Sequence, residues 1–350
     1  MNNLKKAKIA IFYCNASSKL GLGHLYRART LAKSLKYHNF DNILFGPEKK
    51  FLLSSDKTIF KKFFHIRKNY SLNNTIKDLI QCADLYNSKI LIVDDYKFQF
   101  SHQKILKKNN IKWLQYDLKG NKKIISDIIL NYSPNAVNIN YKKKINTKKI
   151  IKLFGTKFSI LRNEFNEVKL KNISAYVRTL VLSFGAGNDK GATIKILKFL
   201  KQVKFRDKIN IILPLNNPNC NLIKNWVSRN SNLKIKIYEN PKKISNILIR
   251  ADLAIISGGT IAYECASLGI PMLISAIADN QINTSKYWHN SSAGIYLGLI
   301  EKLDYKKFKA AFFDMTLNVE LRKQFKKNAL KICDGKGSNR VAAIINQFVI

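Results

Sequence analysis

The stretch IAIFYCNASSKLGLGHLYRARTLAKSL, residues 9–35, determines the fold class that we expect for this chain. Ile9–Cys14 is a short apolar run typical of a buried strand, and a glycine-containing loop follows it. Beyond His24, apolar residues recur at helical spacing from Leu25 to Leu35. A strand, a loop and a helix in this order form the repeating unit of parallel α/β sheets.

The same alternation continues along the chain. Apolar runs predict further strands at Ile90–Val93, Ile111–Tyr116, Ile128–Leu130, Leu180–Phe184, Ile209–Leu213, Leu233–Tyr238, Leu253–Ile256 and Met272–Ile274. Helical spacing predicts helices at Ala192–Leu200, Ile244–Ile249, Thr260–Leu268 and Leu317–Ile350. We therefore predict an α/β protein with two Rossmann-like lobes that face a cleft, and the cleft is the default ligand site.

The length of 350 residues also agrees with two domains. We expect an N-terminal lobe over residues 1–165, a C-terminal lobe over residues 176–335 and a C-terminal helix over residues 336–350. The charged stretch Arg162–Arg178 is interpreted as the linker.

The composition is strongly basic, with 62 Lys and Arg against 22 Asp and Glu, a formal charge of +40. One interpretation is an AT-rich genome that favours Lys codons, and the other is attraction to a polyanion or an anionic membrane. The longest uninterrupted Lys run is only Lys142–Lys144, which argues against a dedicated nucleic-acid arm. An apolar fraction of 46% excludes intrinsic disorder.

The cysteines and the apolar stretches indicate a compartment. The five Cys are scattered without a CxxC pair, which favours a reducing cytosol over a disulfide framework or a zinc site. Gly258-Gly259, Glu264 and Pro271 interrupt the most apolar stretch, Leu253–Ala278, so we expect no transmembrane segment. Ile9–Cys14 is too short for a signal-peptide core. We expect a cytoplasmic protein and leave a peripheral membrane contact open.

The first candidate for catalysis is His24. The loop before it places Gly23 where backbone can approach a ligand closely, and His24 opens a helix. The positive end of a helix dipole favours a neutral imidazole, which could act as a general base. A packing or capping role for His24 stays an alternative.

The second candidate is the segment SGGTIAYE, residues 257–264. A glycine turn and a helix start would direct backbone N–H groups, Ser257, Gly259 and Thr260 toward a phosphate. Glu264, one turn into the helix, could accept hydrogen bonds from a ribose diol. The alternative is an ordinary tight turn between strand and helix.

Three further segments at predicted strand ends carry polar or glycine residues. Asn280 and Gln281 follow a predicted strand, and their amides suit sugar hydroxyls or a helix cap. Phe184–Gly191 lacks the third glycine of a dinucleotide fingerprint at the required place. Asp94-Asp95 at a predicted strand end has no His or Cys companion, so we predict no metal site and no cofactor.

Five segments together resemble one family. SSKLGLGHLYRARTLAKSL, LIVDDY, LFGTKFSILRNEF, LSFGAGND and IISGGTIAYECASLGIPMLISAIADNQ occur in the order found in the UDP-2,4-diacetamido-2,4,6-trideoxy-beta-L-altropyranose hydrolases of pseudaminic acid biosynthesis. The last segment is also similar to the peptidoglycan N-acetylglucosaminyltransferase. The resemblance covers roughly residues 8–300 and implies the glycosyltransferase-B architecture.

The resemblance also implies roles for individual residues. His24 matches the proton acceptor that activates water, Glu264 matches the residue on the uridine ribose, and Arg162 and Asn280 match substrate-binding positions. The implied reaction cleaves the bond between the anomeric carbon and the diphosphate of a UDP-activated amino sugar, without a metal. Tyr13, Asn15, Asp95 and Ala186 depart from the family pattern. Because Asn15 carries no charge, the sequence identifies no carboxylate beside His24.

Three functions stay open at this stage. The first is a UDP-sugar hydrolase, and the second is an inverting glycosyltransferase of surface polysaccharide synthesis on the same fold, in which His24 deprotonates an acceptor hydroxyl. The third is a polyanion-binding protein, although we expect no nucleic-acid partner. The sequence does not indicate an oligomeric state.

Overall fold

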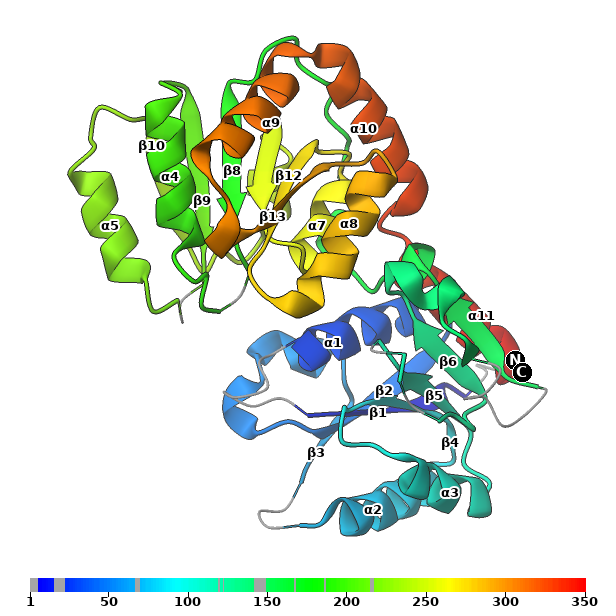
Figure 1. Cartoon of the computed structure of the whole chain (residues 1–350). Coiled ribbons are helices and arrows are strands. Elements are labelled where there is room, and N and C mark those ends of the chain that lie inside the picture. Colours follow the sequence, from blue (N-terminus) through cyan, green and yellow to red (C-terminus); the bar gives the residue numbers. More distant parts are fainter. Residues whose placement is uncertain are drawn as a thin grey trace, which may run out of the picture. The chain divides into compact units, whose positions relative to one another are not determined.

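The computed structural model describes residues 6–15, 23–66, 70–118, 120–121, 123–141, 149–166, 168–185, 187–214 and 217–350. The chain forms two compact units. Unit 1 consists of residues 1–162 and 336–350, and unit 2 consists of residues 163–335. Figure 1 shows their elements, and each unit is described by itself.

Unit 1 is built on a parallel sheet. Among the described residues its strand order is β3-β2-β1-β4-β5-β6-β7. The strands are β1 (Lys8–Cys14), β2 (Phe40–Gly46), β3 (Lys62–His65), β4 (Ser88–Asp94), β5 (Trp113–Tyr116), β6 (Ile128–Asn131) and β7 (Ile151–Phe154). Every neighbouring pair runs parallel, so all carboxyl ends lie along one edge.

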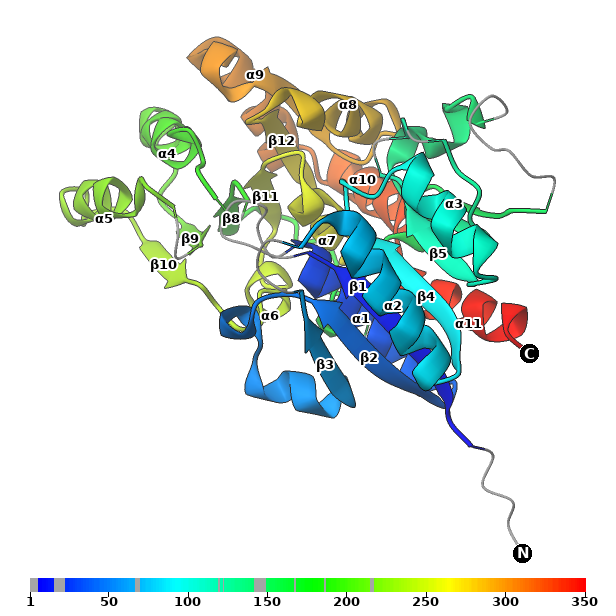
Figure 2. The same ribbon diagram turned by 90° about the horizontal axis from the view of Figure 1, so that it is seen from below.

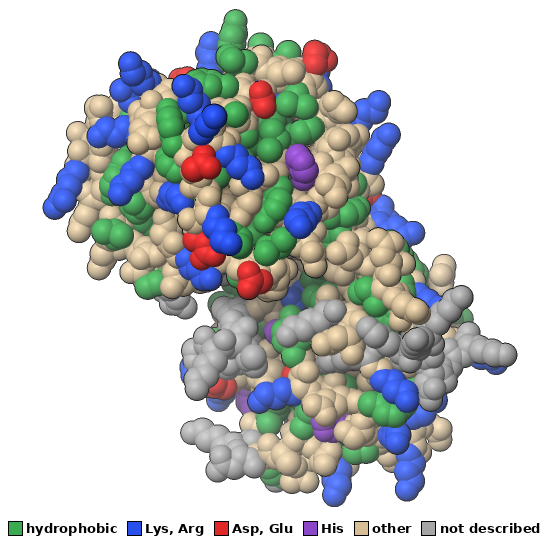
Figure 3. Space-filling model, viewed as in Figure 1, with side chains coloured by type: hydrophobic (Ala, Val, Ile, Leu, Met, Phe, Trp, Pro, Cys, Tyr) green, Lys and Arg blue, Asp and Glu red, His purple; other side chains and the backbone are tan. Residues whose placement is uncertain are grey.

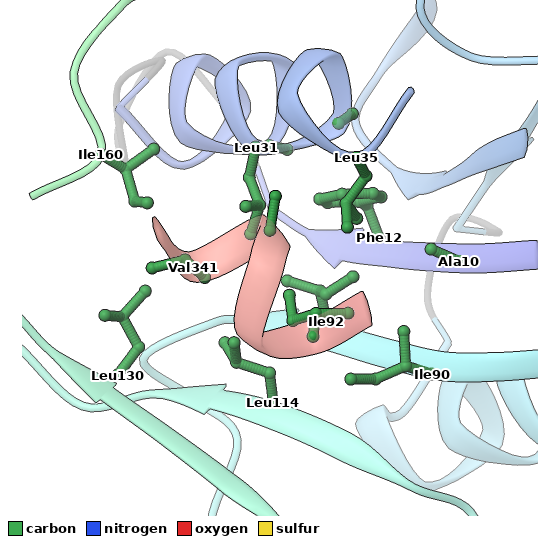
Figure 4. Packing of buried hydrophobic residues seen from close by; sticks show 14 of the residues in the cluster. Ala10, Phe12, Leu31, Leu35, Ile90, Ile92, Leu114, Leu130, Ile160 and Val341 are labelled. Carbon is green, nitrogen blue, oxygen red and sulfur yellow. The ribbon is translucent and has the colours of Figure 1, made fainter. Parts of the chain in front are cut away.

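Helices cover both faces of this sheet. They are α1 (Gly23–Lys36), α2 (Leu72–Leu85), α3 (Phe100–Lys108) and α11 (Gly337–Phe348). Leu31 of α1 and Val341 of α11 share one apolar cluster with Phe12 and Ile92 of the sheet, as Figure 4 shows. Leu79 of α2 and Leu106 of α3 pack on the opposite face, which is turned toward the viewer in Figure 2.

Unit 2 repeats the design with the strand order β10-β9-β8-β11-β12-β13. The strands are β8 (Thr179–Ser183), β9 (Lys208–Leu213), β10 (Ile235–Glu239), β11 (Leu253–Ile256), β12 (Met272–Ala276) and β13 (Ile295–Leu299). The helices are α4 (Ala192–Gln202), α5 (Cys220–Ser228), α6 (Ser245–Leu248), α7 (Thr260–Ser267), α8 (Ile282–Asn290), α9 (Tyr305–Leu317) and α10 (Val319–Ile332). Two parallel-sheet α/β units are the fold class that the sequence predicts.

The segment interpreted as a linker is packed on unit 2. The Asp252 carboxylate accepts hydrogen bonds from the Lys171 ammonium, the Ser174 hydroxyl and the backbone N–H of Arg178 at 2.6–3.0 Å. Glu164 accepts a hydrogen bond of 2.8 Å from the Ser245 hydroxyl. The division therefore falls after Arg162 rather than at residue 165.

The predicted helix Leu317–Ile350 is two helices that belong to different units. α10 ends at Ile332 in unit 2, and α11 begins at Gly337 in unit 1. A Cβ atom at Gly337 would lie 2.2 Å from the Ser159 carbonyl oxygen. Only glycine permits this close approach, so the start of α11 is fixed against unit 1.

Candidate active site

The catalytic candidate of unit 1 lies where the strand order reverses. β1 is flanked by β2 on one side and β4 on the other, and ligands of open α/β sheets bind at the carboxyl ends beside such a reversal. α1 begins at Gly23, which is exposed, and His24 follows with only 4% of its surface exposed. The earlier part of the predicted loop, residues 16–22, lies outside the described residues.

His24 is held by a carboxylate and an arginine. Its Nδ1 lies 2.8 Å from Oδ1 of Asp94, the last residue of β4. Arg27, one turn further along α1, donates to the same carboxylate through Nε at 2.7 Å and Nη2 at 3.1 Å. His24 and Asp94 are both buried, and the fork of Arg27 fixes the plane of the carboxylate.

This arrangement sets the protonation of the pair. Burial raises the pKa of Asp94, but Arg27 and the hydrogen bond with His24 outweigh burial and hold that pKa below its ordinary value. An ionised carboxylate only accepts hydrogen bonds, so His24 Nδ1 carries the proton. The Nε2 atom of a neutral His24 then holds a lone pair.

The surroundings of the pair are aromatic. The edge of the Tyr96 ring meets the His24 ring with centroids 4.8 Å apart, and Arg27 lies over the ring of Tyr116 at 5.7 Å. Asp95 accepts a 2.9 Å hydrogen bond from the Tyr13 hydroxyl and a 2.8 Å hydrogen bond from the Lys97 N–H. Asp95 thus hydrogen-bonds to Tyr13, whereas Asp94 hydrogen-bonds to His24.

Sequence reasoning missed Asp94 as the partner of His24. The family pattern places a carboxylate at position 15, directly after β1, where this chain has Asn15, and Asp94-Asp95 was interpreted only as an unaccompanied strand end. The carboxylate comes from the neighbouring strand β4, which pairs with β1 from Ile9 to Cys14. An acidic residue at the end of an apolar run was the available signal, but strand order is needed to place it beside His24.

Unit 2 has a corresponding reversal between β8 and β11. Ser257 follows β11, and its N–H donates to the Ser183 carbonyl at the end of β8 at 3.1 Å. The Ser257 side chain is completely buried, and its Oγ has no hydrogen-bond partner among the described residues. A Cβ at Gly185 or at Gly259 would lie 3.8 Å from this oxygen, so two backbone loops converge on it.

Because Gly258 has no side chain, the turn after β11 lies directly against the start of α8. A Cβ there would lie 2.0 Å from Ser285 Oγ and 2.9 Å from the Gln281 carbonyl oxygen. Gln281 is fixed in turn, because its Oε1 accepts a 3.1 Å hydrogen bond from the Ile277 N–H. A Cβ at Gly259 would lie 3.7 Å from Gln281 Nε2. The structure therefore brings together Ser257, Gly259 and Gln281, three of the residues predicted from the sequence.

Of the other residues predicted for binding, Thr260, Glu264 and Asn280 belong to unit 2 and Arg162 belongs to unit 1. Thr260 is exposed at the first position of α7, where backbone N–H groups lack partners within the helix. Glu264 is buried one turn further on, with 6% of its surface exposed, rather than on an exposed helix face. Asn280 is exposed in the short 3₁₀ turn Asp279–Gln281. Arg162 is half-buried at the end of the first segment of unit 1.

The loop after β8 is organised by Asp189. Its carboxylate accepts hydrogen bonds from the Thr193 N–H at 3.1 Å and from Asn219 Nδ2 at 2.7 Å. Burial raises the pKa of Asp189, but these hydrogen bonds outweigh it and the net shift is downward. Asp189 thereby orders the segment next to Gly185; Ala186 lies outside the described residues.

The described residues contain no group of three or more His, Cys, Asp or Glu side chains that could hold a metal ion. None of the helices there combines the length and the apolarity needed to cross a bilayer.

Comparison with solved structures identifies the architecture. The chain superimposes on MurG of Acinetobacter baumannii with a TM-score of 0.69 at 13% identity, covering 97% of this chain and 99% of MurG. The same values describe its match to the UDP-GlcNAc 2-epimerase of Neisseria meningitidis, solved with UDP-GlcNAc bound. The chain has the glycosyltransferase-B fold. Because this fold occurs in proteins with different reactions, it does not assign a reaction.

Sequence comparison gives three relatives. The chain is 28% identical over 319 residues to an uncharacterised protein of Methanocaldococcus jannaschii, covering 87% of this chain but only 61% of that protein. It is 22% identical over 349 residues to the spore coat polysaccharide biosynthesis protein SpsG of Bacillus subtilis, covering 96% of this chain and 97% of SpsG.

The third relative carries the name of the family that the motifs resemble. The chain is 24% identical over 290 residues to the UDP-2,4-diacetamido-2,4,6-trideoxy-beta-L-altropyranose hydrolase of Campylobacter jejuni, covering 79% of this chain and 94% of the hydrolase. The resemblance stated from the motifs is confirmed at this level of similarity. No model of a known protein family matches the chain.

Proposed function

We propose that this protein is an enzyme that hydrolyses a UDP-activated amino sugar and releases UDP and a free diacetamido-trideoxy sugar for surface polysaccharide synthesis. The observation that carries the proposal is the buried His24, whose Nδ1 is bound to an ionised Asp94. This arrangement leaves Nε2 to accept a proton at the carboxyl edge of the sheet. The similarity to the Campylobacter hydrolase and to SpsG supports the sugar-nucleotide assignment.

The proposed reaction is a single displacement at the anomeric carbon. His24 Nε2 removes a proton from water, and the water oxygen forms a bond to the anomeric carbon. The bond from that carbon to the diphosphate oxygen breaks, and its electron pair leaves with UDP. The Asp94 carboxylate stabilises the imidazolium that forms, because it lies 2.8 Å from Nδ1.

Unit 2 is proposed to bind the nucleotide. The first turn of α7 presents backbone N–H groups and the positive end of its dipole, which suit the diphosphate. The unpartnered Ser257 Oγ supplies a further donor beside the glycine turn. We assign Glu264 to the ribose hydroxyls and Arg162 and Asn280 to the substrate, as the family resemblance implies. We assign Gln281 to sugar hydroxyls, which its amide suits. Gly23 has no side chain, so the backbone beside His24 can approach the substrate closely.

The second candidate function is that of a UDP-sugar transferase, in which His24 deprotonates an acceptor hydroxyl. Solved structures of similar fold include the spinosyn rhamnosyltransferase SpnG, with a TM-score of 0.62 over 97% of this chain, so the fold is compatible with this candidate. NMR of a panel of UDP-activated amino sugars, incubated with the protein alone, separates the two. Free sugar and UDP are expected without any acceptor. Turnover that appears only after an acceptor is added would establish the transferase.

The roles of the two units are tested by reciprocal variants. His24→Ala should lower turnover by roughly 10²–10⁴-fold, the usual contribution of a general base. Its UDP affinity should change by less than about two-fold, because the base touches water and not the nucleotide. Glu264→Ala should weaken UDP binding by roughly 10-fold or more, the usual effect of losing charge-assisted hydrogen bonds.

His289→Ala, at an exposed position of α8, is the control and should leave both quantities unchanged. Turnover is measured as UDP release, with and without EDTA, and we expect it to persist in EDTA. UDP binding is measured by calorimetry. Full turnover of the His24 variant would remove the proposed mechanism, and equal effects of both variants on UDP affinity would remove the assignment of the nucleotide to unit 2.

A further inference from the structure

Unit 2 carries a groove at the edge of its sheet that the nucleotide loops do not use. The groove has a volume of about 510 Å³. It is lined by the segment that leads into β8, the segment that leads into β9 and the last turn of α9: Tyr176, Val177, Arg178, Val203, Lys204, Phe205, Arg206, Asp207, Phe312, Phe313, Thr316 and Leu317. These segments precede parallel strands, so the groove lies at the amino edge, opposite to Ser257 and Gly259.

The groove exposes apolar side chains. Tyr176 is 70% exposed and Leu317 is 79% exposed. Val203, Phe205 and Phe313 are half-buried between them. Aromatic and leucine side chains of this kind suit the boundary between headgroups and acyl chains, where tyrosine places its ring in apolar surroundings and its hydroxyl in water.

The rim of the groove is cationic. Arg178, Lys204 and Arg206 are all exposed, and Asp207 is the acidic residue among the groove lining. The guanidinium of Arg178 lies over the Tyr176 ring at 5.9 Å, so positive charge and aromatic surface are adjacent. The whole chain carries +40, and Figure 3 shows Lys and Arg spread over the visible face of unit 2. This charge attracts an anionic surface at long range.

The groove is held rigid by the buried Arg322. Its guanidinium donates to the carbonyls of Met315 and Thr316 at the end of α9, at 2.7 and 3.0 Å. It also donates to the carbonyls of Ser174 and Ala175 at 2.8 and 2.7 Å. The two segments that carry Leu317 and Tyr176 are thus fixed to each other, so docking needs no rearrangement of the backbone between them.

We propose that this groove docks unit 2 on an anionic lipid surface, with Tyr176 and Leu317 entering the interface and Arg178, Lys204 and Arg206 meeting lipid phosphates. A second copy of the chain is a poor occupant, because two cationic rims and two charges of +40 repel each other. The proposal is independent of the proposed reaction, since it uses none of the residues assigned to it.

The test is co-sedimentation with vesicles at about 0.15 M salt, where a weak surface attraction is largely screened. Wild type should bind vesicles of phosphatidylcholine with phosphatidylglycerol and not vesicles of phosphatidylcholine alone. Tyr176→Ser with Leu317→Ser should lower binding by roughly 10-fold or more, because the inserted apolar groups are lost. Lys204→Glu with Arg206→Glu should lower it similarly, since each cation near the surface contributes to binding.

Matched controls separate the groove from the net charge. Tyr37→Ser with Leu85→Ser removes two equally exposed apolar residues from unit 1, at 78% and 76% exposure. Lys77→Glu with Lys108→Glu makes the same charge change at exposed helix positions of unit 1. Both controls should bind within about two-fold of wild type. Equal losses in the controls, or no vesicle binding by wild type, would overturn the proposal.

A depth probe gives a second, independent measurement. Leu317→Trp places an indole at the groove. Trp113 and Trp288 are fully buried, and the half-buried Trp226 is replaced by Phe in both the probe variant and its reference. Brominated lipids should quench the new fluorescence when anionic vesicles are added. Vesicle binding without quenching would mean a purely electrostatic contact and would overturn insertion. Tight binding to RNA in place of vesicles, weakened by the same groove variants, would also overturn the proposal and assign a nucleic-acid partner.

Discussion

At the scale of single residues, Asp94 hydrogen-bonds to both His24 and Arg27 of the candidate site. It is a buried carboxylate with one oxygen toward His24 and both oxygens toward Arg27. The histidine could be predicted from the sequence, because a glycine-containing loop before a helix is a local pattern. Its partner could not, because β4 is separated from His24 by 70 residues and only the strand order makes them neighbours.

The acid stability of the protein should report on this carboxylate. The pKa of Asp94 is lower in the folded state than the unfolded value of about 3.9, so its ionised form stabilises the fold. That contribution is fully present above the unfolded pKa and is lost as the pH falls below about 4. Asp94→Asn should cost roughly 3–5 kcal/mol of unfolding free energy at pH 7, because Arg27 stays buried without its partner.

The difference between wild type and Asp94→Asn should shrink as the pH falls below about 4, since the unfolded wild-type chain then binds a proton at Asp94 that the folded state does not bind. Urea unfolding followed by circular dichroism between pH 2 and 7 measures it. Asp41→Asn is the control, because Asp41 pairs with the exposed Lys61 and should cost less than about 1 kcal/mol at any pH. A loss for Asp94→Asn that does not vary with pH would contradict the assigned role of the charge.

At the scale of elements, most strands that the sequence predicts contain apolar runs, and β1, β4 and β11 are the clearest of them. β2 was missed because Asn42 interrupts its apolar pattern. That side chain is buried and donates from Nδ2 to the Ala32 and Ile59 carbonyls at 2.9 and 3.3 Å, so it connects β2 to α1 and to the segment before β3. A polar residue that is buried and held by tertiary hydrogen bonds cannot be distinguished from a loop residue by periodicity.

Replacing Ser257, in the turn between β11 and α7, tests whether its hydroxyl stabilises the fold or binds a ligand. Its buried hydroxyl has no partner among the described residues, so Ser257→Ala should leave stability unchanged or slightly raised. UDP affinity should fall by roughly 5–10-fold, as expected for one lost hydrogen bond to a charged group. Thermal unfolding and calorimetry with UDP measure the two quantities.

Ser275→Ala is the control for Ser257→Ala, because the Ser275 hydroxyl has a hydrogen-bond partner within the protein. Ser275 is equally buried on β12, but its Oγ donates to the Gly298 carbonyl at 3.0 Å. The variant should lose about 1 kcal/mol of stability and keep its UDP affinity. If Ser257→Ala behaved like Ser275→Ala, the hydroxyl would have a structural role and the nucleotide assignment would lose its sharpest support.

At the scale of the whole molecule, unit 1 is discontinuous along the chain. Residues 336–350 return to it after the whole of unit 2, and α11 places Val341 and Ile345 in the unit 1 core with no exposed surface. The core of unit 1 is therefore complete only when the last residues have been synthesised, whereas unit 2 is one continuous segment. Contacts of such long sequence separation form late, since the chain entropy of closing the loop must be overcome first.

Substitutions in α11 should therefore act on the N-terminal strands. Ile345→Ala removes a fully buried side chain and should cost roughly 2–5 kcal/mol, the usual loss for this change in a core. Hydrogen exchange followed by mass spectrometry should show faster exchange in β1 and β4 of unit 1, while β11 and β12 of unit 2 keep their protection. Met315→Ala, at a fully buried position of α9, is the matched control and should reverse the pattern. Faster exchange in β11 rather than in β1 after the Ile345 substitution would mean that α11 stabilises unit 2, and that the chain does not return to its first half.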